Sequence, residues 1–247
     1  MRLSFILLVS GLLFNVRCNV PKVKLTNQVD PDIVLVNIGD VDRAAIAKML
    51  LKIDSCKPIL IAIDAWFIRE KDSLQDSKLV EALRIVKNDI LSYALDSLGN
   101  PIRSHNKFRS HAMDEGLAVL EETNGLSDRF IPVSKIKRNL YEHFALKIAR
   151  HWKPDFGYKF KVNKSIPVNF TRTVNQYKHV HGEDINKDLV ANIFKGKIVI
   201  FGYLGPTDED KHFTPIRLVK DYPDKKPDTY GVVILANALR TILDFQD

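Results

Sequence analysis

Three mainly apolar runs, rich in isoleucine and valine, stand out along the chain. They are Ile33–Ile38, Ile59–Asp64 and Lys197–Gly202, each bounded by polar residues, proline or glycine. A strand without polar alternation is typical of a parallel sheet that is covered on both faces. We therefore predict that these runs are buried strands of one parallel sheet.

Segments with apolar residues at helical spacing alternate with these strands. In Arg43–Ile53, apolar side chains recur every three or four residues, and Asp42 stands where an N-cap is expected. A strand, this helix and a second strand form a βαβ unit. The other predicted helices are Asp76–Lys87, Asn139–Trp152, Asp188–Phe194 and Val232–Leu243.

The middle of the chain is less regular. Further strands are predicted at Ile90–Leu95 and Ser165–Phe170, and residues 96–135 are punctuated by glycines between short apolar pieces. A long polar loop is predicted from Tyr203 to Thr229, and loops of that length are usually functional or flexible. The predicted fold class is α/β: a mostly parallel sheet flanked by helices, with an irregular β-rich insertion in the middle.

The N-terminus has a different character. Arg2 precedes an uncharged stretch from Leu3 to Val16, which is as long as a signal-peptide core and shorter than the roughly 20 residues of a membrane-spanning helix. We predict a signal peptide over residues 1–18. The alternatives are a lipid or helical anchor and a buried helix. A polar linker over residues 19–31 and one domain over residues 32–247 complete the predicted organisation.

Composition and charge exclude some functions. The chain has 247 residues, 45% hydrophobic and 27% charged, as in an ordinary globular protein. Its net charge of +7 is scattered. The densest basic clusters, Lys135–Arg138 and Lys225–Lys226, are too short for a nucleic-acid-binding stripe, so we expect no nucleic-acid partner. Removal of residues 1–18 leaves Cys56 as the sole cysteine, without an internal disulfide partner.

An ordered set of segments resembles a known family. They are Asp32–Gly39, Arg43–Ala47, Ile61–Phe67, Asp72–Leu79, Tyr141–Ala149, Phe194–Gly202, Asp210–Pro215 and Tyr230–Asn237. Together they resemble the CHASE2 domain, an extracytoplasmic sensory module. The residues that carry the motif at the C-terminal end are Gly196, Gly202, Phe213, Pro215, Gly231 and Asn237. One departure is Leu235, which stands where the family usually has histidine before Ala-Asn.

The resemblance implies an exported sensor that binds a small-molecule or protein signal and is not an enzyme. Larger family members join the module to transmembrane helices and a cytoplasmic kinase or cyclase output domain. Here the output is expected to belong to another protein, such as a membrane-bound kinase or cyclase, to be missing from this chain, or not to exist. No cofactor is expected. The expected location is the periplasmic or extracytoplasmic face of the membrane.

The candidate ligand-binding site lies beyond the carboxyl ends of the predicted strands, where open α/β sheets hold their ligands. The candidate residues at this edge are Asp40, Asp42, Asp64, Tyr203, Asp210 and Thr214. Each aspartate after a strand also has a structural interpretation. Asp40 and Asp42 are suited to helix capping, and Asp64 to hydrogen bonding within its loop.

Three alternative interpretations remain. In a haloacid-dehalogenase-like phosphatase, Asp40 is the nucleophile, Asp42 the acid/base, and the acids of 208–210 hold Mg²⁺, but that family expects threonine soon after the second aspartate. His179 and His181 form a His-x-His pair, which we interpret as exposed loop residues, and no metal site is predicted. The third alternative is a structural interaction module of the cell envelope.

Overall fold

A seven-stranded sheet forms the centre of the protein. The computed structural model describes residues 23–39, 41–154, 160–186, 191–216 and 226–245. The strand order is β11-β1-β12-β2-β3-β4, with β5 also paired to β3, and only the β3–β4 pair is antiparallel. The strands are β1 (Ile33–Asn37), β2 (Leu60–Ile63), β3 (Asp89–Leu95), β4 (Pro101–Ile102), β5 (Asp114–Leu117), β11 (Lys178–His181) and β12 (Ile198–Gly202). The predicted parallel sheet is confirmed.

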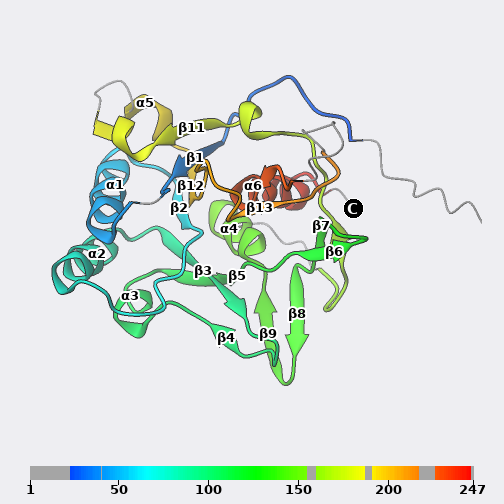
Figure 1. The fold of residues 1–247 in the computed structure, drawn as a ribbon, viewed down its shortest axis with the longest axis horizontal. Helices are drawn as coiled ribbons and strands as arrows, with labels where there is room; N and C mark the ends of the chain where they lie inside the picture. The colour runs from blue at the N-terminus through cyan, green and yellow to red at the C-terminus, as the bar shows by residue number, and fades with distance from the viewer. Residues whose placement is uncertain (1–22, 40, 155–159, 187–190, 217–225, 246–247) are drawn as a thin grey trace, which may run out of the picture.

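Helices cover both faces of this sheet, as Figure 1 shows. One face is packed by α1 (Arg43–Ser55) and α2 (Ser73–Ile85), and the other by α4 (Phe144–Trp152) and α6 (Gly231–Leu243). Successive side chains of a strand point to opposite faces. Accordingly Val34 of β1 joins the α1–α2 core while its neighbour Leu35 joins the α4–α6 core. Burial on both sides explains the uninterrupted apolar runs.

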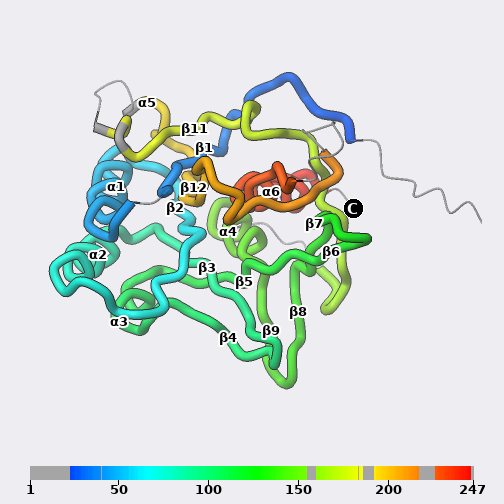
Figure 2. The backbone as a smooth tube through the Cα atoms, viewed as in Figure 1, coloured from blue at the N-terminus to red at the C-terminus, as the bar shows by residue number. Residues whose placement is uncertain are grey.

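The insertion in the middle is β-rich, as predicted. It comprises a three-stranded sheet, a two-stranded hairpin that extends away from the body in Figures 1 and 2, and a short helix. The elements of the insertion are α3 (Asn106–Arg109), β6 (Glu121–Thr123), β7 (Leu126–Phe130), β8 (Val133–Ile136), β9 (Asn139–Glu142) and β10 (Ile166–Pro167). The remaining short elements are η1 (Val174–Gln176), η2 (Gly182–Asn186), α5 (Ala191–Phe194), β13 (Lys211–His212) and β14 (Thr229–Tyr230).

Two predicted elements were partly wrong. The helix expected from Asn139 begins instead at Phe144, because residues 139–142 pair with β8 and His143 caps the helix by accepting a hydrogen bond at Nδ1 from the amide of Ala145. The strand expected over Ser165–Phe170 is reduced to the two residues of β10, which pair with β7.

Other boundaries shift without changing the architecture. Helix α2 begins at Ser73, three residues before the predicted start, because Asp72 caps it. Within the predicted long loop, β13 pairs with β14. The first residues of the helix predicted over Asp188–Phe194, like the signal peptide predicted over 1–18, lie outside the described residues.

The segment before β1 is tied to α6 by a buried ion pair. Both carboxylate oxygens of Asp30, a residue only 2% exposed, accept hydrogen bonds of 2.6–2.7 Å from Arg240 of α6. Burial alone would raise the pKa of this carboxyl, but the Arg240 guanidinium and backbone amides hold the pKa below its usual value. Residues just before β1 are therefore fixed to the last helix.

This pair generates a stability prediction. Replacing Arg240 by methionine should lower the free energy of unfolding by about 3 kcal/mol, because the buried Asp30 carboxylate loses its principal partner. The matched control is Arg84→Met, which removes an exposed pair with Glu81 on α2 and should change stability little. Urea denaturation at pH 7 compares the two. Equal effects would contradict the assigned role of the buried pair.

Candidate functional site

A cleft lies at the carboxyl ends of β1, β2 and β12. It consists of two adjoining cavities that share Asp64, Trp66 and Asp210. The first cavity has a volume of about 330 Å³ and is lined in part by His143, and we call it the His143 cavity. The second, of about 350 Å³, is lined by Tyr203 and by residues that follow β1, and we call it the Tyr203 cavity. Both volumes are at the lower end of the range for small-molecule sites.

Asp64 is the residue that follows β2, and it lies between the two cavities. Its backbone amide donates to the carbonyl of Phe201 on β12 (2.8 Å), so the sheet itself fixes its position. Burial, and secondarily the nearby Asp210 carboxylate, raise the pKa of the Asp64 carboxyl to about 6, although Ser92 and His212 partly offset this rise. None of the salt bridges among the described residues involves Asp64.

Asp210 reaches the cleft from the loop after β12, and helix α6 holds it there. Its backbone carbonyl accepts a hydrogen bond from the amide of Gly231, the first residue of α6 (2.9 Å). A Cβ added to Gly231 would lie 2.8 Å from both carboxylate oxygens of Asp210. A larger residue at this position would therefore displace the Asp210 carboxylate from the start of the helix.

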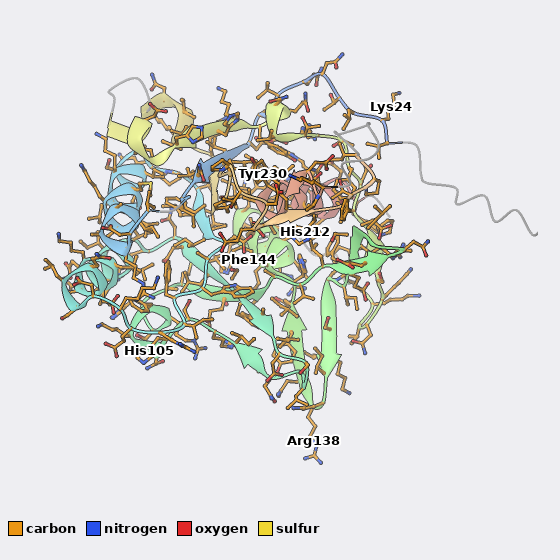
Figure 3. The ribbon with its side chains drawn as sticks, in the orientation of Figure 1. Lys24, His105, Arg138, Phe144, His212 and Tyr230 are labelled. Atoms are coloured by element: carbon orange, nitrogen blue, oxygen red, sulfur yellow. The ribbon has the colours of Figure 1, made fainter. Side chains whose placement is uncertain are left out.

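Two histidines line the His143 cavity. His212 of β13 has Nε2 3.7 Å from Asp210 and Nδ1 3.3 Å from the Ser127 hydroxyl. Figure 3 labels His212 in the centre of the view. His143 is buried, and burial lowers its pKa to about 4, so it is neutral at physiological pH. The backbone of Val119 lies beside the ring, but Nε2 makes no hydrogen bond of full geometry there.

Apolar side chains complete the walls of the His143 cavity. They are Trp66, Ala118, Val119, Leu120 and Leu235. Trp66 is 44% exposed, and its Nε1 donates to the Ser92 hydroxyl (3.0 Å), which fixes the orientation of the indole. The departure from the family pattern, Leu235, places an apolar side chain of α6 in this wall where the family usually has an imidazole.

The structure brings three of the six predicted edge residues together: Asp64, Tyr203 and Asp210 line the cleft. Asp42 instead caps α1 by accepting a hydrogen bond from the amide of Ala45 (2.7 Å), the structural role that the sequence also allowed. Thr214 is buried with its hydroxyl 2.9 Å from that of Thr229, and it lines neither cavity. Asp40 lies outside the described residues.

The motif residues mostly position the elements around the cleft. Gly202 allows α6 to approach β12, since an added Cβ would lie 2.6 Å from Cβ of Val232. Gly196 has φ +66° in the turn before β12. The buried Asn237 side chain accepts from the amides of Thr171 and Arg172 and so ties α6 to that segment. Phe213 is exposed and its carbonyl accepts from Ser127, while Pro215 is buried.

His179 and His181 are exposed, as predicted. The predicted loop was wrong, because both histidines lie on the edge strand β11. Asn37 Nδ2 lies 3.1 Å from His181 Nδ1, which pairs this histidine with the end of β1. No group of three or more histidine, cysteine or carboxylate side chains suited to a metal ion occurs among the described residues. Over the same residues, no helix combines the length and apolarity needed to cross a bilayer.

The fold and the cleft define an open-sheet α/β domain with helices on both faces. Its sequence matches the family model of the CHASE2 domain over residues 14–247, nearly the whole chain, and the chain belongs to this family. CHASE2 is a family of extracytoplasmic sensory domains, so the chain is a sensory module. The resemblance seen in the sequence is thus confirmed. Neither the curated proteins nor the solved structures contain a match.

Sequence reasoning missed Trp66, His143 and His212 as cleft residues. Trp66 carried a usable signal, since a large aromatic two residues after a buried strand lies at the same edge as Asp64. His143 was hidden because the predicted helix began at Asn139 and placed it inside the helix. His212 reaches the cleft through the short β13–β14 pair, which joins residues from the two ends of a long loop.

The raised pKa of Asp64 predicts an unusual effect on stability. Between pH 3.8 and about 6 the unfolded chain releases this proton and the folded chain keeps it, so Asp64 lowers stability progressively across that window and fully above it. Asp64→Asn should therefore raise the free energy of unfolding by about 1–3 kcal/mol at pH 7.5 and have little effect below pH 4.

Urea denaturation at both pH values measures this difference. The other ionisable residues of the cavity wall, Glu122, His143, Asp210 and His212, are the same in both proteins. The control is Asp208→Asn in the loop after β12, where the pairing with Lys211 lowers the pKa of the carboxyl, so its removal should not stabilise the protein. A destabilising Asp64→Asn at pH 7.5 would show that Asp64 is a structural residue.

Proposed function

We propose that this chain is an exported sensory module that binds a small ligand in the cleft and acts on an output protein encoded separately. The observation that carries this proposal is Asp64, a carboxylate held in the cleft by the sheet, which forms no salt bridge within the part of the chain that the structure describes. A desolvated charge is costly to fold, and such groups are concentrated at functional sites. Membership of a sensory family supports the same interpretation.

Helix α6 supplies a route from the cleft to the rest of the molecule. Its first two turns carry Gly231 and Leu235, which line the His143 cavity, and its last turn carries Arg240, which binds Asp30 just before β1. A ligand that moves the start of α6 therefore acts on a rigid element whose other end holds the N-terminal segment. In our proposal this segment follows a signal peptide or anchor, and the output partner is a membrane-bound kinase or cyclase.

A ligand screen with a blocked-cavity variant tests the proposal. Ala118→Phe should fill the His143 cavity, because Ala118 is a half-buried residue of its wall. A true ligand at 100 times its Kd should stabilise the wild-type protein by about 2.7 kcal/mol in thermal unfolding and should not stabilise the variant.

The matched control for that screen is Met113→Phe, which adds an aromatic ring at a separate cavity lined by Tyr93 and Arg103. This variant should respond to the ligand as the wild type does. If no compound of any charge class stabilises the wild type more than Ala118→Phe, the cleft is not a ligand site. Specific co-purification of an envelope protein in that case would favour the structural interaction module.

Export is tested by cell fractionation of the full chain with a C-terminal tag. We expect the protein outside the cytoplasm, shortened at its N-terminus near Cys18 or retained at the membrane by residues 1–18. The control is Leu7→Arg combined with Leu8→Arg, which interrupts the apolar stretch and should leave the protein in the cytoplasm. Unprocessed wild-type protein free in the cytoplasm would contradict the proposal.

A further inference from the structure

The chemistry of the His143 cavity restricts what it can bind, given the proposed function that the cleft holds a small ligand. Three carboxylates line it, from Asp64, Glu122 and Asp210, and among the described residues of its wall there is no lysine or arginine. The nearest imidazole to these acids, His212, is 3.7 Å from Asp210. A ligand that places an anionic group here would be repelled, and a cation would be attracted.

His143 provides a second requirement that does not depend on the acids. The side chain is 2% exposed, and Nδ1 accepts the amide proton of Ala145 at 3.1 Å. The neutral ring must therefore carry its proton on Nε2. His143 lines the cavity, and the acceptor beside its ring is the backbone carbonyl of Val119 in the same wall, which does not meet full hydrogen-bond geometry with Nε2. A buried donor that is poorly paired costs free energy, so a ligand that offers a better-placed acceptor at this point gains from it.

The cavity wall between the carboxylates and His143 is apolar, so it favours a ligand with an apolar part. Trp66 is oriented by its hydrogen bond to Ser92, and Leu235 faces the same cavity from α6. An aromatic face beside carboxylates favours an organic cation, because the ring quadrupole attracts positive charge. The volume of about 330 Å³ limits the ligand to a small molecule.

We propose that the His143 cavity binds a small organic amine, with its protonated nitrogen at Asp64 and Asp210, its apolar body against Trp66 and Leu235, and a neutral hydrogen-bond acceptor at Nε2 of His143. The acceptor is a hydroxyl, ether or carbonyl oxygen and not a carboxylate, because His143 contributes a proton donor without a positive charge.

Four compounds of nearly equal size separate these requirements. Tyramine carries an amine and a hydroxyl, 2-phenylethylamine the amine alone, 4-(2-hydroxyethyl)phenol the hydroxyl groups without charge, and 3-(4-hydroxyphenyl)propanoate an anion. Their affinities are measured on the full domain at pH 7.5 from the indole NH signal of Trp66 in ¹H–¹⁵N NMR spectra. We expect tyramine to bind most tightly, 2-phenylethylamine about fivefold more weakly, and the neutral and anionic compounds more weakly still.

Two variants assign each interaction to a residue. Asp64→Asn should weaken both amines at least tenfold, at about 1.4 kcal/mol per tenfold, without changing the neutral compound. His143→Asn keeps an N-cap for α4 but shortens the side chain. The affinity of this variant for tyramine should therefore fall to that for 2-phenylethylamine. Its affinity for 2-phenylethylamine should equal that of the wild type. Asp208→Asn, in the loop that carries Asp210 but outside both cavities, should leave all four affinities unchanged.

The outcomes distinguish this inference from the proposed function. Equal binding of tyramine and the neutral compound, preference for the anion, or no response of Trp66 to any of the four would overturn the assignment of an amine ligand. If the wider screen still yields a ligand that Ala118→Phe abolishes, the sensory cleft stands with a different ligand class. If that screen is also empty, both proposals fail together.

Discussion

Burial of both faces of a parallel sheet is the constraint on which the rest of this structure depends. With α1 and α2 on one side and α4 and α6 on the other, the central strands hold apolar side chains along their length. Polar groups are therefore placed where the strands end. At the carboxyl ends of β1, β2 and β12 this produces a cleft with Asp64 in its centre, fixed through its backbone to β12.

The same constraint determines how well the sequence predicted the fold. The strands β1, β2 and β12 were identified because their apolar runs are long and continuous, and α1 and α6 because their periodicity is strong. The helix predicted from Asn139 began too early because β9 has a mixed apolar and polar pattern that fits a helix or a hairpin. Pairing with β8, a contact that local periodicity does not encode, decided between them.

Site residues were easier to predict the closer they follow a strand of the sheet. Asp64 follows a strand directly and was identified. His143 and Glu122 belong to the insertion, whose short strands have only weak periodicity in the sequence. Asp42 looked equivalent to Asp64 in the sequence, but the helix that follows it takes its carboxylate as a cap. Capping and ligand binding draw on the same residue types, so spacing alone does not separate them.

The central claim is that the cleft holds Asp64 as a desolvated carboxylate that a cationic ligand would pair with. A titration of the side-chain carboxyl carbon of Asp64 by ¹³C NMR, assigned with Asp64→Asn, tests this claim most directly. The account predicts a midpoint near pH 6 in the free protein, moving to lower pH when a cation occupies the cleft. A midpoint near the usual aspartate value of about 3.9, unaffected by any ligand, would contradict it.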